Sequence, residues 1–378
     1  MMQKVIRFLK KESVLVIAWV AAVISAFFVP PNAGYLGYID FRTLGILWSL
    51  MVIMEGLKRI GLFHKIGSVL LKRTRAVWQL AVVLILLCFF FSMLITNDVA
   101  LLTFVPFTIY ILARIRKRQL LIPVIVLQTL AANLGSMLTP IGNPQNLYLF
   151  SLSGMSIGSF LGLMAPYTAI TLLLLMVSVL FLKEKGTAIQ GDLEEEEKKE
   201  ERGSAVRIWV YGVLFLLALL VVLRLIPYWI LCLVVLVAVF LLDKKVLISI
   251  DYALLFTFTG FFIFTGNLGS IPSISRFLTE MITGREVLTG VIASQFISNV
   301  PAALLLSGFT RQYHELILGV NFGGLGTMIA SMASLISYKI FAQAYSDKKG
   351  RYFLTFTLLN LLYLGILLGS WLILRSFT

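Results

Sequence analysis

Amide and hydroxyl side chains recur at matched positions in the two halves of this sequence. The segments 133–141 and 321–329 share Asn, Gly, Thr and Ile at a constant offset of 188 residues. Upstream of each segment lies an Ile-(Thr/Ser)-Asn triplet, at 95–97 and at 297–299. Amide, hydroxyl and carbonyl oxygens suit a hard monovalent cation, and free N–H groups at helix N-termini suit a small oxyanion. The repeated segments therefore predict an ion-binding site.

These segments supply the residues from which we expect the site to be built. The expected substrate ligands are Thr96, Asn97, Thr139, Pro140, Gly142, Asn143, Ser298, Asn299, Thr327 and Ser331. The expected ligands of a coupling ion, Na+ or H+, are Asp98, Asn97, Asn133, Gly135, Asn299 and Asn321. Neither set contains Lys or Arg. An anionic substrate would therefore depend on helix N-termini, hydroxyls, amides and co-bound cations for neutralisation.

Asp98 is the one carboxylate that the expected arrangement of spans places away from a water-facing helix end. Ionisable groups inside membranes are energetically costly and usually mark an ion path or a proton relay. Val300 occupies the corresponding place in the second half, so a proton or cation role would belong to the first half alone. The alternative is a water-exposed turn at Asp98, which would follow if the apolar arms around it were two full spans.

The composition excludes most catalytic classes. Of 378 residues, 59% are hydrophobic and 13% are charged, whereas soluble domains carry about 25% charged residues. Two His and two Cys, all far apart, offer neither a disulfide framework nor a transition-metal site. The sequence also lacks a P-loop and a base–nucleophile pair, so we expect no enzyme and no cofactor. The net charge of +14 lies in short clusters between apolar runs, which indicates a lipid bilayer and no nucleic acid as partner.

The apolar runs predict roughly ten membrane-spanning helices of about 20 residues each. The first runs from Val14 to Pro30 and has no A-x-A cleavage site after it, so we expect it to be retained. The N-terminus is expected in the cytoplasm, because basic residues cluster before this run, at 58–75 and at 114–118. The protein is expected to be a multi-pass protein of the cytoplasmic (inner) membrane. The segment 58–75 is expected to form a short amphipathic helix along the interface.

The matched segments divide the chain into two expected repeats. The first repeat covers 1–182, a charged cytoplasmic linker covers 183–207, and the second repeat covers 208–378. Each repeat contains a hairpin tip, at 96–98 and 298–300, and a broken helix, at 133–146 and 321–331. The first hairpin is expected to open to the cytoplasm and the second to the outside, so the repeats are inverted. The predicted fold is an all-α integral membrane protein of two inverted-topology repeats, each with a re-entrant hairpin and a broken transmembrane helix.

The prediction of function rests on the helix breaks, which are expected at membrane depth. Non-helical backbone is tolerated there only where it faces protein or a water-lined cavity. Interrupted segments at corresponding positions of two inverted halves point to a transporter site near the midplane of the bilayer. The alternative is that the glycines in these segments serve close helix packing. The transporter interpretation predicts that Asn97, Asn133, Asn299 and Asn321 converge, and it is wrong if the tips lie far from the breaks.

The motifs resemble those of a known group of membrane transporters. Thr96-Asn97-Asp98 with Thr139-Pro-Ile-Gly-Asn-Pro-Gln-Asn146, and Ser298-Asn299-Val-Pro301, resemble the ion transporter superfamily, which includes arsenite permeases, citrate transporters and divalent-anion:sodium symporters. The similarity is greatest to the arsenite-permease and citrate-transporter side and to YbiR-like bacterial anion permeases. It implies a scaffold and a mobile transport domain, an elevator-like movement and, in many members, a homodimer. The divalent-anion symporters have Ser-Asn-Thr at both tips, and this sequence departs from that pattern.

Two functions remain as alternatives. The first is a secondary active transporter of a small anion or oxyacid, of the carboxylate, inorganic oxyanion or arsenite class, coupled to Na+ or H+. The second is a Na+/H+ antiporter in which Asp98 alternately carries the cation and the proton. The residues alone do not distinguish the coupling ion, the substrate or the direction of transport.

Overall fold

The structure is a computed structural model that describes residues 12–71, 74–182 and 204–376. Every regular element in these ranges is a helix. This confirms the predicted all-α class. The basic residues at the start of the chain, and most of the predicted linker 183–207, lie outside the described residues.

The helices of the first half follow the predicted order. They are α2 (Ser13–Ala26), α3 (Tyr35–Tyr38), α4 (Phe41–Arg59), α5 (Leu62–Leu71), α6 (Val77–Ile95), α7 (Asn97–Arg114), η1 (Arg118–Leu120), α8 (Leu121–Gly135), η2 (Ser136–Leu138), α9 (Pro144–Ser153) and α10 (Ile157–Leu180). Local chemistry sets several of these ends. Asp40 caps α4 by accepting the Thr43 N–H at 3.0 Å, and Gly154 ends α9 with a left-handed φ of 71°. The short helix α5 lies in the segment that was expected to be amphipathic.

The second half contains a corresponding series. Its helices are α11 (Ser204–Val222), α12 (Tyr228–Asp243), α13 (Lys245–Ser249), α14 (Tyr252–Gly269), α15 (Pro272–Ile282), α16 (Glu286–Ile297), α17 (Asn299–Leu306), α18 (Tyr313–Phe322), α19 (Met332–Ala344), η3 (Ser346–Lys348) and α20 (Lys349–Arg375).

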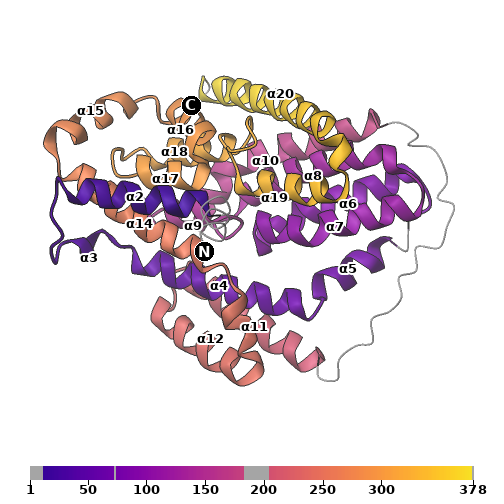
Figure 1. Ribbon diagram of the computed structural model, residues 1–378, viewed down its shortest axis with the longest axis horizontal. Coiled ribbons are helices and arrows are strands. Elements are labelled where there is room, and N and C mark those ends of the chain that lie inside the picture. The colour runs from indigo at the N-terminus through magenta and orange to yellow at the C-terminus, as the bar shows by residue number, and fades with distance from the viewer. Residues whose placement is uncertain (1–11, 72–73, 183–203, 377–378) are drawn as a thin grey trace.

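The helices pack into two groups (Figure 1). The first bundle consists of α2, α4, α11, α12 and α14, and the site bundle consists of α6 to α10 and α16 to α20. Contacts between the bundles run chiefly through α14 with α17 and through α4 with α9. Both bundles contain helices from both halves of the chain. The two halves of the chain therefore interlock in space.

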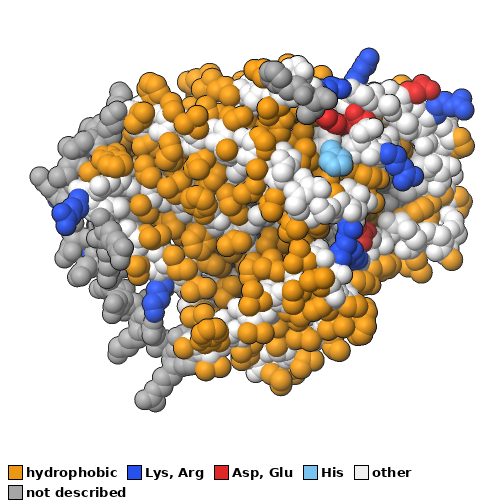
Figure 2. All heavy atoms as spheres, turned by 180° about the vertical axis from the view of Figure 1, so that it is seen from behind, with side chains coloured by type: hydrophobic (Ala, Val, Ile, Leu, Met, Phe, Trp, Pro, Cys, Tyr) orange, Lys and Arg blue, Asp and Glu red, His pale blue; other side chains and the backbone are white. Residues whose placement is uncertain are grey.

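The surface is that of a protein that lies in lipid. Seven helices in the described ranges are long and apolar enough to cross a membrane, and four shorter apolar helices accompany them. Figure 2 shows a broad hydrophobic face, with most of the charged side chains gathered on the right-hand side of the view and a few at its left. Phe27, Phe181, Trp209 and Leu241 are among the exposed large apolar residues. A soluble monomer would not expose so large an apolar surface.

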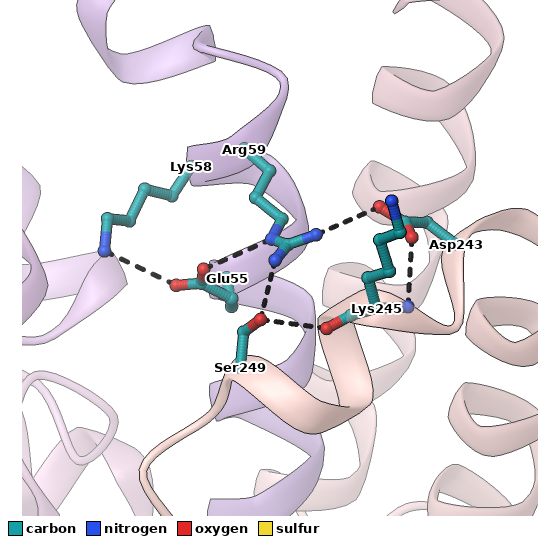
Figure 3. A network of polar contacts seen from close by, with 6 residues as sticks. All are labelled: Glu55, Lys58, Arg59, Asp243, Lys245 and Ser249. Atoms are coloured by element: carbon teal, nitrogen blue, oxygen red, sulfur yellow. Dashed lines mark hydrogen bonds and ion pairs between the residues drawn. The ribbon is translucent and has the colours of Figure 1, made fainter.

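A charged cluster joins the end of α4 to α12 and α13 (Figure 3). Arg59 pairs with Glu55 at 3.5 Å and with Asp243 at 3.3 Å, and it donates to Ser249 Oγ at 2.6 Å. These contacts bring the end of α4 together with α12 and α13.

The two hairpins differ in length. The arms α6 and α7 have 19 and 18 residues, whereas α16 and α17 have 12 and 8. An arm of 19 residues extends about 28 Å at 1.5 Å per residue, so the first hairpin is the longer of the two. The tips of both hairpins nevertheless contact the helix breaks.

Candidate ion and substrate site

Both hairpin tips have the same backbone conformation. Thr96 has φ 72° and ψ 150°, and Ser298 has φ 73° and ψ 154°. Residues other than glycine rarely adopt a positive φ, and such positions persist where the surrounding structure holds them. Asn97 donates its backbone N–H to the Gly142 carbonyl at 3.2 Å, and Asn299 donates to the Ala330 carbonyl at 3.0 Å. Each tip is thus fixed to the helix break of its own half.

The central asparagines of the two breaks make reciprocal contacts. Asn133 Oδ1 accepts from Ser331 Oγ at 3.0 Å, and Asn133 Nδ2 donates to Ser334 Oγ at 3.2 Å. Asn321 Oδ1 accepts from Asn143 Nδ2 at 3.3 Å, and Asn321 Nδ2 donates to Asn146 Oδ1 at 2.6 Å. Residues 331 and 334 match 143 and 146 at the offset of 188. Asn133 therefore bonds to Ser331 and Ser334 of the second half, and Asn321 bonds to their counterparts in the first half.

The first tip joins this network directly. Asn97 Nδ2 donates to Asn133 Oδ1 at 3.1 Å, and both residues are buried. Asn299 in the second tip is also buried and lies beside Gly324, where an added Cβ would be 2.9 Å from Asn299 Nδ2. The contacts thus place Asn97 against Asn133, Asn321 against Asn143 and Asn146, and Asn299 beside Gly324. Asn97, Asn133, Asn299 and Asn321, with Asn143, Asn146, Ser331 and Ser334, are called the asparagine cluster below.

Eight helix ends meet around the asparagine cluster. Helices α7, α9, α17 and α19 begin here, and α6, α8, α16 and α18 end here or within a few residues. The N-termini present partial positive charge and the C-termini partial negative charge. Among the described residues, no Lys or Arg hydrogen-bonds to the cluster. The site is thus built from neutral dipoles of both signs.

The two predicted threonine ligands hold the hairpins in place. The Thr139 hydroxyl donates to the Met93 carbonyl on α6, and Thr327 Oγ1 donates to the Gln295 carbonyl on α16 at 3.2 Å. Each acceptor lies three residues before its hairpin tip. These hydroxyls are committed to the backbone and do not join the asparagine cluster. Ser298 Oγ lies 3.4 Å from the Ala330 carbonyl and is likewise occupied at its tip.

The predicted glycine and proline positions are tightly packed. A Cβ on Gly135 would lie 2.3 Å from the Phe89 carbonyl, and one on Gly142 would lie 2.1 Å from the Ser136 carbonyl. A Cβ on Gly323, the residue that matches Gly135, would likewise lie only 2.5 Å from Ser294 Oγ. Pro140 is buried between η2 and α9. The packing interpretation of the glycines therefore holds at these positions, because they let the breaks approach the hairpins.

Asp98 follows the first tip and is partly buried. Its backbone N–H donates to Asn97 Oδ1 at 2.9 Å. Within the described ranges its carboxylate accepts no hydrogen bond and forms no ion pair. Among the described residues this carboxylate therefore has no partner, and it lies next to Asn97 of the asparagine cluster.

Two glutamines of the site were not singled out from the sequence. Gln295 Nε2 donates to the carbonyls of Gly323 at 3.0 Å and Leu325 at 2.9 Å, and Gln295 Oε1 accepts the Thr327 N–H at 2.8 Å. These bonds hold the second helix break against α16, the first arm of its hairpin. Gln145 lies in the first turn of α9 and is buried. Gln145 falls inside the quoted motif 139–146, and Gln295 lies three residues before the second tip, so their positions were the available signal.

An all-helical membrane protein with two broken helices and two hairpins meeting at a polar centre has the architecture of a membrane transporter. A family model described as "Citrate transporter" matches residues 1–312. The chain belongs to this citrate transporter family, within the ion transporter superfamily that its motifs resemble. Its relatives are named as transporters or membrane proteins and not as enzymes.

Three relatives illustrate the similarity. Inner membrane protein YbiR of Escherichia coli is 34% identical over 83% of this chain and 84% of its own length. The uncharacterized transporter MJ0456 of Methanocaldococcus jannaschii is 32% identical over 88% of this chain and 89% of its own length. The silicon efflux transporter LSI3 of Oryza sativa is 35% identical over 124 residues, which are 32% of this chain and 25% of that protein.

Proposed function

We propose that this protein is a secondary active transporter of a small anion or oxyacid in the cytoplasmic membrane. The observation that carries the proposal is the meeting of four helix N-termini at the asparagine cluster without a basic residue. Such N-termini bind anions through free N–H groups and the helix dipole. Because they carry only partial charge, an anion here would need a co-bound cation. Asp98 and the carbonyls at the ends of α6, α8, α16 and α18 supply oxygen ligands for Na+, or a carboxylate for H+.

Transport would proceed by alternating access of an elevator type. The site bundle contains both hairpins and both breaks, so it would be the moving part, and the first bundle would be the scaffold. The proposed orientation has the N-terminus in the cytoplasm and the two halves in inverted topology. The reciprocal contacts of Asn133 and Asn321 support an internal two-fold relation between the halves.

Uptake into proteoliposomes tests this proposal. Citrate, succinate, phosphate, sulfate and arsenite are offered in turn, with Na+ and pH gradients imposed independently. We expect gradient-driven uptake of at least one of them, and its loss in Asn321→Ala. Asn360→Ala is the matched control, because Asn360 is a buried asparagine of α20 whose amide bonds only to Phe356 within its own helix. Absence of uptake of every compound, under either gradient, would contradict the proposal.

The second candidate is a Na+/H+ antiporter. The unpaired carboxylate of Asp98, next to the amide network, favours it. Proton movement driven by a Na+ gradient, in vesicles without any anion substrate, would select this function. Anion uptake that requires the Na+ gradient would select the symporter.

A further inference from the structure

The first turn of α9 contains a buried amide oxygen that has no hydrogen-bond partner among the described residues. Gln145 is 2% exposed, and within the described ranges its Oε1 atom has no hydrogen-bond donor. The amides on either side are fully engaged. Asn143 caps the Asn146 N–H at 2.9 Å and donates to Ser136, and Asn146 donates to the Met137 carbonyl at 3.2 Å. Buried polar side chains usually have a partner, so the exception at Gln145 requires an explanation.

The backbone at the same position is also unpaired. Pro144 has no N–H, and the next two N–H groups after Gln145 bond to Asn143, through its side chain for Asn146 and through its carbonyl for Leu147 at 3.2 Å. The Gln145 N–H alone in this turn finds no acceptor among the described residues. A free donor at the N-terminus of a ten-residue helix and an unpaired buried amide oxygen therefore occur in one residue.

The fold itself does not require an amide here. The matched residue of the second half is Ala333, which is fully buried at the start of α19. The second break still forms the tip contact and the threonine contact that the first break makes with its hairpin. The glutamine is thus an addition to the first half, beside the residues that hold Asn321.

The unpaired groups of Gln145 determine which kind of ligand they can bind. The backbone N–H needs an acceptor, and the side-chain amide offers both a donor and an acceptor. A fully ionised oxyanion has acceptors only, so it would leave the Gln145 oxygen unpaired. An oxyacid that retains a proton on one oxygen supplies an O–H for the amide oxygen and an oxygen for the N–H groups.

We propose that Gln145 contacts the substrate and selects an oxyacid, neutral or singly charged, that still carries a hydroxyl. This inference rests on the proposed transport function. It assigns the discrimination between protonated and fully ionised oxygen compounds to one residue of the first break.

Ligand-induced thermal stabilisation of the purified protein tests the assignment. Phosphate and arsenite, which bear O–H groups near neutral pH, are compared with sulfate, which does not. We expect phosphate or arsenite to raise the unfolding temperature and sulfate to leave it unchanged. In Gln145→Leu the apparent affinity should fall roughly 10-fold or more, as for loss of a hydrogen bond to a buried polar partner.

Gln128→Leu is the matched control. Gln128 is a buried glutamine of α8 that also has an unpaired Oε1, but its amide donates to the Leu84 carbonyl at 3.1 Å. It should keep the wild-type preference for phosphate or arsenite. The unliganded Gln145→Leu protein should unfold no earlier than wild type, since the change removes an unpaired polar group.

The outcomes separate the two proposals. Unchanged affinity in Gln145→Leu, or equal binding of sulfate and phosphate by wild type, overturns the role of Gln145. Uptake confined to sulfate or citrate overturns it too, while the transport function stands. If wild type neither binds nor transports any of these compounds, the transport function fails and this inference fails with it.

Discussion

At the level of single residues, the site combines a neutral network with one carboxylate. The amides of the asparagine cluster are bonded to one another and to serines from the opposite half. This arrangement fixes their orientation without any charge. Asp98 is the exception, because its carboxylate has no partner among the described residues. The ionisable residue of the site, Asp98, is therefore distinct from the amides and hydroxyls that fix the geometry of the asparagine cluster.

Replacing Asp98 by Asn should abolish the coupling to a gradient. The amide preserves the shape but can no longer bind a proton or neutralise a cation. In a symporter, gradient-driven accumulation should stop while exchange of substrate continues. In an antiporter, all activity should be lost. Anion uptake and Na+-driven proton movement, measured side by side in reconstituted wild type and mutant, distinguish these results.

The pH dependence provides a check on the same residue. Protons and Na+ should compete at Asp98, so the Na+ concentration for half-maximal rate should rise as the pH falls. The dependence should vanish in Asp98→Asn. If both activities and their pH profiles are identical in mutant and wild type, Asp98 is a water-exposed turn residue and has no part in coupling.

At the level of helices, the breaks are held by close backbone contacts. The added Cβ of Gly142→Ala would meet the Ser136 carbonyl at 2.1 Å, so the chain between η2 and α9 would have to shift. We expect a destabilisation of about 1–3 kcal/mol, typical of overpacking. The glycine change should therefore reduce folded protein and transport together. Gly162→Ala in α10 has open space around it and should leave both unchanged.

Pro140→Ala distinguishes the role of the helix break from the role of packing better than Gly142→Ala does. It removes the ring that prevents a continuous helix and introduces a smaller side chain. We expect transport to fall more than the yield of folded protein. The ratio of uptake to folded protein, from size-exclusion chromatography of the same preparation, measures this. An equal loss of both would mean that Pro140 serves folding alone.

Arg224 connects the first bundle to the C-terminus of half-helix α9. Its guanidinium donates to the Gly154 carbonyl at 3.1 Å and to the Phe150 carbonyl at 3.2 Å, and it lies 5.6 Å from the Phe150 ring centre. A cation at this end complements the helix dipole, which should contribute about 0.3–1 kcal/mol at an exposed position. Arg224→Met should lower the unfolding temperature slightly and change the uptake rate, because α9 begins at the asparagine cluster.

Arg42→Met provides the comparison. Arg42 donates to the Val221 carbonyl at 3.3 Å, so its contact joins α4 to α11 inside the first bundle. It should alter stability by a similar amount without a comparable effect on rate. Equal effects of the two changes on uptake would show that Arg224 does not act through α9.

At the level of the whole molecule, the two bundles must move relative to each other if transport follows an elevator path. The contact between α14 and the turn after α17 is suited to a test, because an added Cβ on Gly308 would lie 2.5 Å from Thr265 Cγ2. Cysteines at 265 and 308, in a background without Cys88 and Cys232, should form a disulfide on oxidation. We expect the oxidised protein to lose uptake and to keep ligand-induced stabilisation, and reduction to restore uptake.

A cross-link within the first bundle is the control. An added Cβ on Gly260 would lie 3.1 Å from Ala18 Cβ, so cysteines at 18 and 260 would link α2 to α14. This link should leave uptake intact. Full uptake with the 265–308 link completely formed would contradict relative movement of the bundles.

Much of the architecture is readable from the sequence because local composition controls it. Apolar runs indicated the membrane class, and Gly, Pro and Asn clusters indicated the tips at Thr96 and Ser298 and the breaks after Asn133 and Asn321. A helix ends where its own residues cannot continue it, so these features do not depend on distant neighbours. The matched spacing of the halves also predicted that the four asparagines converge.

The contacts within the site could only be decided by the tertiary structure. Asn133 meets Ser331 across 198 residues of chain, and no local pattern specifies that pair. The commitment of Thr139 and Thr327 to backbone carbonyls, and the unpaired amide of Gln145, likewise depend on how hairpins pack against breaks. Residue type gives each side chain its donors and acceptors, whereas the packing of helices distant in sequence determines which of them remain free for a ligand.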